Sequence, residues 1–474
     1  MSTTTILLLT MAAYAAVLAI IGRHQPASRG NQTFFRADRR APWPMVAFGM
    51  VGASISGVTF VSVPGMVLSS AMTYLQVCAG FILGYMAVAF VLLPLYYRLS
   101  LTTIYTYLGQ RLGLRSYLTG AAFFMLSKMV GSAVKFYVVC IVVHQFAMQA
   151  LGVPFWLTVV LLVMLIWLYT RRGGIATLVV TDTVQTACLF TALLLIIYKV
   201  IGVMDLSLTD AVSRIVADER SQVLVTADWT SPRYLWKQLL SGAFIVVVMT
   251  GLDQDMMQKN LTCRTLREAQ KNMLCYGMAF LPANLLFLSL GVLLAQWATA
   301  AGCLPSHGDE LLPVFVASQG GLVVVPFVVG IVAASFSSAD SALTALTTSC
   351  CIDICHRPDD VALRRRIHMA MSAVFAMVIL LVHAANSSSL IDTIYTIVGY
   401  TYGPLLGLFA FGLLTRRKVA DRWVPLVCVA SPLLCFATDS VCQRLLDYHF
   451  GYELLLLNGL LTFAALAALS KHTD

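Results

Sequence analysis

Two aspartates in otherwise apolar stretches of this sequence are surrounded by side chains that could bind a cation. Asp182 stands between two threonines, and Asp340 is accompanied by Ser337, Ser338 and Ser341. If this second stretch is helical, its hydroxyls and its carboxylate fall within little more than one turn. Sodium, like the alkaline-earth ions, is a hard cation that prefers oxygen ligands. The cluster therefore predicts an ion site, although serines also pack helices closely and bond to their own backbone, which leaves a purely structural role open.

Glycine and hydroxyl residues interrupt the apolar run between Phe48 and Phe60. Gly52 and Gly57 lie near its middle, and Pro64 follows it. A helix can open at such a point, which exposes carbonyl oxygens to cations and the start of the next half-helix to anions. An unbroken helix whose small residues pack closely against a neighbour is the alternative. The hydroxyl residues of this segment are Ser54, Ser56 and Thr59.

Lys128 and Lys135 lie in a single apolar stretch, and their spacing places them on nearly one face of a helix. An ionisable group at bilayer depth costs about 2.5 to 3.5 kcal/mol, so each one needs a partner or a function. Either lysine could bind an anionic solute, pair with a neighbouring aspartate, or extend toward the membrane surface. Asp253 and Asp255, close to Lys259 in the sequence, are interpreted as salt-bridge residues of a gate or a loop.

The elements that must position these residues are transmembrane helices. The 474 residues are 59% hydrophobic and only 11% charged, with a mean hydropathy of +0.83, whereas soluble domains carry about 25% charged residues. Apolar stretches such as 151–169 and 454–469 approach the roughly 20 residues that cross a bilayer as a helix. They are too long and alternate too little for barrel strands. The net charge of +9 does not indicate nucleic-acid binding, because the placement of charge matters more than its sum in a membrane protein.

We predict about thirteen membrane spans in a single transport domain. The first, 5–21, is interpreted as a retained helix rather than a signal peptide, because its basic residues follow the apolar run. An N-terminus outside and a C-terminus inside place most arginines and lysines in inner loops, apart from one long outer connection, 199–237. The twelve cysteines show no paired spacing typical of zinc sites or disulfide frameworks. The predicted spans begin near Thr5, Pro44, Leu75, Leu118, Pro154, Ile175, Leu239, Met273, Val314, Met369, Leu390, Val424 and Leu454.

Several motifs, taken in their order along the chain, resemble the sodium/solute symporter family, which includes bacterial sugar, proline and sialic-acid symporters and animal glucose cotransporters. Each motif alone is moderately specific, whereas their order along nearly the whole chain is a strong signal. The motifs are Ser56-Gly57-Val58-Thr59-Phe60, Gly173-Gly174 followed by Thr181-Asp182 and Gln185, Asp253-Gln254-Asp255-Met256-Met257-Gln258, the serine cluster around Asp340, and Gly399-Tyr400-Thr401-Tyr402-Gly403-Pro404.

This resemblance implies an all-α, LeuT-type fold, in which two inverted repeats of five helices each alternate access to a site at the membrane midplane. An extra N-terminal helix would occupy 4–22 and the first repeat 43–201. The second repeat would occupy 233–415, and two further helices would follow at 420–470.

The resemblance also implies two sets of oxygen ligands for sodium. Backbone ligands leave little trace in a sequence, so the carbonyls are assigned by motif position. The first site would use the carbonyls of Gly52, Ile55 and Ala334 and the hydroxyls of Ser337 and Ser338. A second site, known in some members, would use Asp182, Ser337, Asp340 and Ser341. Several members of the family carry a hydroxyl residue where this chain has Asp340. The resemblance therefore implies the second sodium ion less directly than the first.

Solute contacts are implied on four spans. In sialic-acid symporters a basic residue of the fourth span holds the carboxylate, and Lys135 is similar in position. A lysine in place of arginine would hold a carboxylate less directionally, because it lacks the planar fork. Phe244 could stack against the solute. The remaining contacts would be Ser54, Ser56 and Thr59 on the broken span and Gln76 on the third.

Together these features predict a sodium-coupled symporter that imports a small polar organic solute, for example a carboxylate such as a sialic acid, across a bacterial inner membrane. Proton coupling through Asp182 or Asp340 is the nearest alternative, and a non-transporting membrane sensor is another. The sequence shows no filter-like loop of a channel and no nucleophile, base or metal-ligand pattern of an enzyme. The expected partners are the solute, sodium ions and membrane lipid, without nucleic acid, and the oligomeric state is left open.

Overall fold

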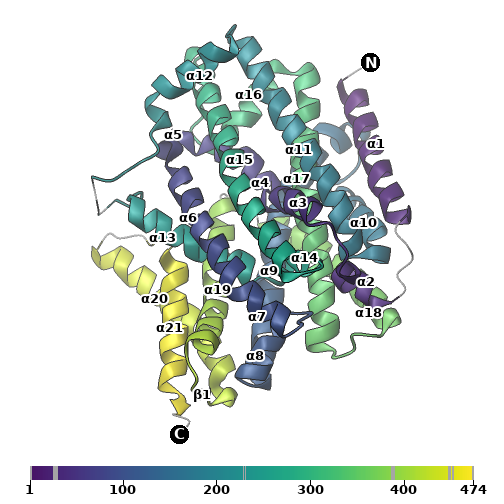
Figure 1. The fold of residues 1–474 in the computed structure, drawn as a ribbon. Helices are drawn as coiled ribbons and strands as arrows, with labels where there is room; N and C mark the ends of the chain where they lie inside the picture. Colours follow the sequence, from purple (N-terminus) through teal and green to yellow (C-terminus); the bar gives the residue numbers. More distant parts are fainter. Residues whose placement is uncertain are drawn as a thin grey trace.

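The chain forms an elongated bundle of helices. The computed structural model describes residues 3–24, 30–227, 229, 231–385, 390–446, 450 and 453–471. Helix α1 lies along one edge of the bundle against α10, while α20 and α21 lie at the opposite edge (Figure 1). The main helices are α1 (Thr3–His24), α3 (Trp43–Ser54), α4 (Gly57–Gly65), α6 (Tyr74–Ala87), α7 (Leu93–Arg98), α9 (Leu114–Val143), α10 (Phe155–Gly173), α11 (Ile175–Val203), α13 (Leu235–Val246), α14 (Gln254–Asn260), α15 (Leu266–Ala300), α17 (Val324–Ser349), α18 (Val361–Ala385), α19 (Leu390–Leu414), α20 (Val424–Leu446) and α21 (Glu453–Ala468).

Short elements connect these helices. Two-residue strands β1 and β2 pair in antiparallel fashion and tie the segment after α19 to the segment after α21. Single π-helical turns continue α6, α9, α13 and α17. The connecting elements are α2 (Asn31–Arg36), α5 (Val67–Ser70), α8 (Thr106–Arg111), α12 (Leu208–Ala217), α16 (Leu311–Gln319), β1 (Lys418–Val419) and β2 (Ser470–Lys471).

The apolar helices confirm an integral membrane protein. Within the described residues, nine helices are long and apolar enough to span a bilayer, or ten if one bent pair counts as a single span. Three shorter apolar helices accompany them, at Trp43–Ser54, Tyr400–Leu414 and Glu453–Ala468. The predicted number of about thirteen spans stays a prediction. The ninth span begins at Val324 rather than near Val314, because Gly320, with φ 53°, ends the separate helix α16.

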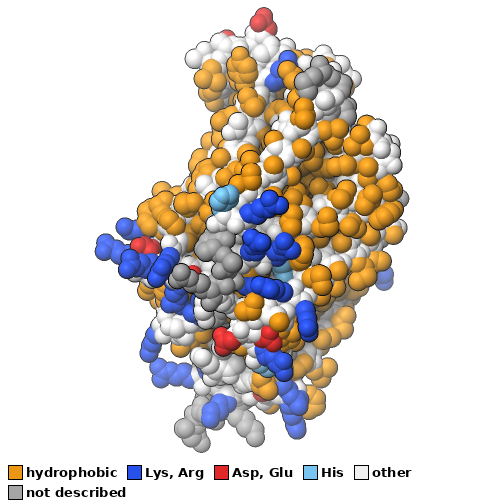
Figure 2. Space-filling view, turned by 90° about the vertical axis from the view of Figure 1, so that its right-hand side faces the viewer, with side chains coloured by type: hydrophobic (Ala, Val, Ile, Leu, Met, Phe, Trp, Pro, Cys, Tyr) orange, Lys and Arg blue, Asp and Glu red, His pale blue; other side chains and the backbone are white. Residues whose placement is uncertain are grey.

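Charged side chains are unevenly distributed over the surface. Figure 2 shows Lys and Arg side chains over the middle and lower part of one face, whereas the upper part of that face is mostly hydrophobic. Such segregation agrees with the collection of basic residues on one side of the membrane, and the orientation of the termini stays a prediction.

The second predicted span is broken in its middle. Helix α3 ends at Ser54, and both Ile55 (φ −87°, ψ 99°) and Ser56 (φ −82°, ψ 169°) are extended. Ser56 then caps α4, because its hydroxyl accepts a hydrogen bond from the Thr59 N–H at 3.3 Å. Gly57 begins α4 so close to α17 that a β-carbon there would collide with the Ser335 hydroxyl. The expected opening of this helix is therefore confirmed.

A second bent helix lies in the other half of the chain. The axis turns by 72° between 235–251 and 254–260, that is, between α13 with its π-helical turn and α14. Asp253 occupies the bend, where its side chain accepts a hydrogen bond from the Asp255 N–H at 2.8 Å. The bend turns α14 back into the protein, and the side chain of Lys259 on that helix is only 3% exposed.

Helix α17 is the most enclosed of the long helices. In its most apolar window 72% of the residues are buried, the highest share among the described spans. It packs against α11 and α9, and also against both halves of the broken helix, α3 and α4. This packing brings the serine cluster of α17 to the place where the broken helix opens.

Candidate functional site

The serines of α17 bond directly to the backbone around the break between α3 and α4. The Ser338 hydroxyl donates to the Ala53 carbonyl at 2.9 Å and lies 3.3 Å from the carbonyl of Ala334. The Ser335 hydroxyl accepts a hydrogen bond from the Gly57 N–H at 2.9 Å. One side of α17 therefore holds both the last turn of α3 and the first turn of α4.

The end of α3 offers a negative electrostatic environment to a cation. The last carbonyls of a helix carry the negative end of its dipole and lack partners within the helix. At this end the Gly52 carbonyl accepts a 3.2 Å bond from the N–H of Ile55, which is shared with the Val51 carbonyl, and beyond it the backbone is extended. Gly52 and Ile55 lie close in sequence to Ala53, whose carbonyl accepts the Ser338 bond. Ser337, by contrast, turns toward Asp182, and its hydroxyl donates to that carboxylate at 2.7 Å.

Asp182 and Asp340 form a second polar cluster beside the first. The Asp182 carboxylate lies 2.8 Å from the ammonium of Lys259, and both side chains are buried. Asp340 accepts a hydrogen bond from the Tyr169 hydroxyl at 2.6 Å, and Ser341 lies 3.4 Å from its other oxygen. The cluster therefore contains two carboxylates, but also an internal cation that already neutralises one of them.

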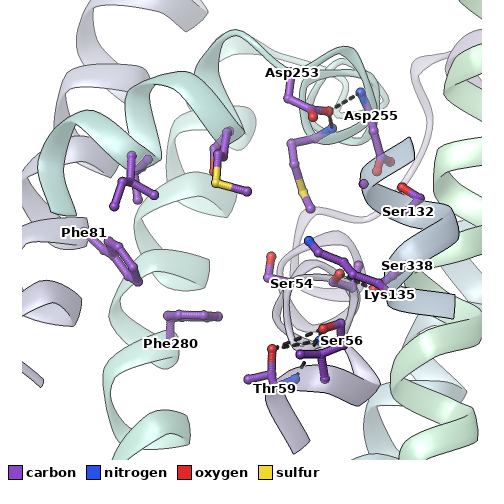
Figure 3. A pocket seen from close by; sticks show the side chains of 18 of the residues that line it. Ser54, Ser56, Thr59, Phe81, Ser132, Lys135, Asp253, Asp255, Phe280 and Ser338 are labelled. Atoms are coloured by element: carbon purple, nitrogen blue, oxygen red, sulfur yellow. Dashed lines mark hydrogen bonds between the residues drawn. The ribbon is translucent and has the colours of Figure 1, made fainter. Parts of the chain in front are cut away.

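A cavity lies next to the break in the helix. Its empty volume is about 1410 Å³, which includes space that opens to solvent. Of the residues predicted to contact the solute, Ser54, Ser56, Thr59 and Lys135 line this cavity. Ser338 lines it too, so a side chain predicted to bind sodium also faces the space for the solute. Figure 3 shows Lys135 extending toward Ser54 and Ser338, with Phe81 and Phe280 on the other side of the view.

The two lysines of α9 have different surroundings. Lys128 pairs with Asp253 at 3.2 Å and with Asp255 at 2.6 Å. Lys135 is half-buried at the cavity wall and makes no ion pair or hydrogen bond with any residue in the part of the chain that the structure describes. Lys128 is thus an internal ion-pair residue, while Lys135 keeps its cation available to the cavity.

Two residues predicted to contact the solute lie outside the cavity lining. The Gln76 amide is buried and bonds to the Arg233 carbonyl at 3.0 Å and to the Gln238 side chain at 3.1 Å. Phe244 is 39% exposed on the outer face of α13, because the helical rotation turns its neighbours Ile245 and Val246 to the cavity instead.

Comparison with known proteins agrees with this geometry. The model of the sodium:solute symporter family matches residues 34–421. The chain belongs to the sodium:solute symporter family. The sodium/sialic acid symporter NanT of Aliivibrio fischeri is 24% identical over 429 residues, which cover 87% of this chain and 82% of NanT.

Solved structures share the fold of this symporter. A Na+-coupled sialic acid symporter in a substrate-bound outward-open state superposes with a TM-score of 0.81 at 18% identity, over 100% of both chains. Mhp1, a nucleobase-cation-symport-1 family transporter in a closed conformation, gives a TM-score of 0.58 at 14% identity, with 93% of this chain and 94% of Mhp1 covered. The predicted LeuT-type fold is confirmed, and the protein is a Na+-coupled symporter.

Several residues of the symporter's site escaped the sequence analysis. The predicted topology places Lys259 among the basic residues of the inner loops, whereas the bend before α14 buries it against Asp182. In the sequence, the position of Lys259 directly after the Asp253–Gln258 motif could have indicated its role. Tyr276 bonds to Ser54, and Tyr402 bonds to Asp253. Nothing in the local sequence distinguishes these aromatic residues from ordinary core residues, because their roles depend on contacts between distant helices.

The Lys128 ion pairs join α9 to the bend before α14, and we expect them to stabilise the packing of these two elements. Lys128→Ala would leave two buried carboxylates without their cation. Because the lysine side chain retains 13% exposure at the cavity, we expect a loss of about 1 to 3 kcal/mol in stability. The melting temperature of the purified symporter measures this loss. Lys128→Arg keeps the charge and should retain most of the stability, and equal stability of Lys128→Ala and the native protein would contradict the assignment.

Proposed function

We propose that this symporter carries an acidic small organic solute together with sodium, and that the ion binds where α17 meets the break in the second span. The observation that carries the proposal is the position of Ser338. Its hydroxyl reaches the Ala53 carbonyl in the last turn of α3 and also faces the cavity that Lys135 lines. A sodium ion bound there would fix the broken helix in the geometry that the solute requires.

The coupling ion is assigned to the first predicted site. Its proposed ligands are oxygen atoms from α3, from the extended residue that follows it, and from α17. A second ion would have to share Asp182 with the ammonium of Lys259, so the energetic coupling is attributed to the first site. The proposed ligands are the carbonyls of Gly52, Ile55 and Ala334 and the hydroxyls of Ser337 and Ser338, and the second set comprises Asp182, Ser337, Asp340 and Ser341.

Coupling requires that sodium bind one conformation better than another. An ion with equal affinity for both conformations would not shift the equilibrium between them. The ligands of the first site come from α3 and from α17, so a relative movement of these helices would change the number of oxygens around the ion. Inward sodium movement is further favoured by about 2.3 kcal/mol per charge for each 100 mV of membrane potential.

The proposed solute carries negative charge. Lys135 supplies a cation at the cavity wall, and the N-terminal end of α4 adds the positive end of a helix dipole near Ser56 and Thr59. The relative from Aliivibrio fischeri is named for sialic acid, which is a carboxylate. Four residues are proposed to contact the solute: Ser54, Ser56, Thr59 and Lys135.

The arrangement of the chain in the membrane is also proposed. The first helix of each predicted repeat is the broken one, α3 with α4 in 43–201 and α13 with α14 in 233–415, which supports the division into inverted repeats. The N-terminal helix, 4–22, and the final pair, 420–470, lie outside the repeats. We place the protein in a bacterial inner membrane, with the N-terminus outside and the C-terminus in the cytoplasm.

A sodium titration of Ser338→Ala tests the ion site without knowledge of the solute. Sodium that binds the folded protein raises its melting temperature in a concentration-dependent manner. Loss of one oxygen ligand should raise the half-saturating sodium concentration about tenfold, since 1.4 kcal/mol corresponds to a factor of ten. The titration is made at fixed pH, with potassium replacing sodium to hold the ionic strength constant.

Ser62→Ala is the matched control. Ser62 lines the same cavity but belongs to α4, beyond the break that follows α3. Its sodium response should equal that of the native protein. An unchanged half-saturating concentration in Ser338→Ala would reject the site, and a response that follows pH instead of sodium would favour proton coupling.

A further inference from the structure

The cavity is divided into a polar part and an apolar part, and the division bears on the class of solute. Ser54, Ser56, Thr59 and Lys135 lie on one side of the view in Figure 3, and Phe81 and Phe280 lie on the other. The apolar part has an aromatic wall in which the Phe81 and Phe280 rings approach to 5.7 Å between centroids. Other apolar residues also line the cavity: Val58, Val63, Val77, Ile245, Val246 and Met249.

Most hydroxyls of the polar part already have partners within the protein. Ser54 and the Tyr276 hydroxyl form a hydrogen bond, and Tyr276 in turn accepts one from Tyr85 at 2.9 Å. Ser56 and Thr59 lie 3.3 Å apart and form one hydrogen bond with each other at the start of α4, where each also accepts a backbone N–H. A solute with many hydroxyls would compete with these bonds for the same side chains, and unpaired buried polar groups are costly.

The Lys135 ammonium is a charged group of the cavity that remains available to a solute. Lys128 is held by two aspartates, whereas the ammonium of Lys135 lacks an ion pair among the described residues and extends into the cavity. Ser132 lies one helical turn before Lys135 on the same face of α9 and also lines the cavity. A lysine with a nearby hydroxyl can hold one carboxylate group.

We propose that the solute is an amphipathic monocarboxylate whose acid group binds at Lys135 and Ser132 and whose apolar body packs against Phe81 and Phe280. The proposal rests on the proposed function and narrows it from acidic solutes in general to acids with an apolar body. Burial of that body against aromatic and aliphatic side chains supplies affinity through the hydrophobic effect. Among the described residues of the cavity lining, only Lys135 is a cation without an ion pair, and it selects one negative charge.

The test compares four ligands on the purified, full-length symporter, with sodium and with potassium in its place. Hexanoate has six carbons, one carboxylate and no hydroxyls, and 3-phenylpropanoate adds an aromatic ring. Gluconate has the same number of carbons and the same charge as hexanoate, but carries hydroxyls along its chain. Hexanamide keeps the apolar chain and removes the charge. The readout is the sodium-dependent rise in melting temperature as each ligand is titrated.

Hexanoate and 3-phenylpropanoate are expected to stabilise the protein in sodium at concentrations at least tenfold below those of gluconate, while hexanamide gives no saturable response. Phe280→Ala should weaken 3-phenylpropanoate about fivefold or more and leave the sodium response without ligand unchanged. The requirement for sodium separates binding in the cavity from partition of an apolar acid into detergent or lipid.

The contrary outcomes separate this inference from the proposed function. Selection of gluconate over hexanoate would overturn the amphipathic class and leave a sodium-coupled acid symporter intact. Equal responses to hexanoate and hexanamide would overturn both the amphipathic acid and the carboxylate role of Lys135. A sodium response without any response to the carboxylates would overturn the inference while sparing the ion site.

Discussion

Replacement of Lys259 by methionine is expected to destabilise the symporter by about 3 to 5 kcal/mol, the cost of leaving a buried charge without its partner. The ammonium lies 2.8 Å from the Asp182 carboxylate, and the two side chains are 3% and 2% exposed. No water can replace the lost cation at such burial. The melting temperature in detergent or nanodiscs should fall strongly, and the yield of folded protein should fall with it.

A double-mutant cycle gives this prediction its control. Asp182→Asn together with Lys259→Met removes both charges, and the pair should recover much of the stability lost by the single change. Lys199→Met, which removes an exposed lysine from α11, the helix of Asp182, should change stability by less than about 0.5 kcal/mol. A Lys259→Met protein as stable as the native one would show that the ion pair contributes nothing.

The same ion pair affects how a second sodium ion could bind. With Lys259 in place, the Asp182 and Asp340 cluster holds two carboxylates and one cation, so its charge is partly neutralised within the protein. A sodium ion near Asp182 would experience repulsion from the ammonium at short range. We therefore assign the coupling to the end of α3, where carbonyl dipoles supply the negative electrostatic environment.

The sequence predicted the elements of the fold and the broken helix because both depend on local composition. Long apolar runs define helices that cross a bilayer. Glycines and hydroxyl residues in the second span mark the place where α3 ends and α4 begins. Ser338 of α17 lies beside that opening, where its hydroxyl donates to the carbonyl of Ala53.

Partners between distant helices could not be derived in this way. Spacing alone placed Lys128 and Lys135 on nearly one face of α9, and only the packing of α14 shows that Lys128 is paired. Phe244 lies one residue from a cavity-lining position, which in a helix rotates the side chain by about 100°. The 72° bend that buries Lys259 depends on the packing of α14 against α17 and α3, so a hydropathy argument assigns that lysine to a loop.

Lys135→Met is expected to reduce the affinity for carboxylate solutes by about tenfold to a hundredfold, because a hydrogen bond to a charged group contributes about 1.5 to 3 kcal/mol. Methionine preserves most of the volume of the lysine side chain and removes only its charge. The cavity should then lose its preference for acids, so that hexanoate and hexanamide stabilise the protein to similar extents. Titrations of both ligands in sodium measure this change.

The response to sodium alone should stay within about threefold of the native value in Lys135→Met, because Lys135 is not among the proposed ligands of the ion. This separates loss of the solute contact from general damage to the fold. Lys135→Arg should keep the preference for acids, since guanidinium retains the charge and offers a fork that matches a carboxylate. If Lys135→Met still discriminates acid from amide as the native symporter does, then the carboxylate binds elsewhere in the cavity and the proposed role of Lys135 is wrong.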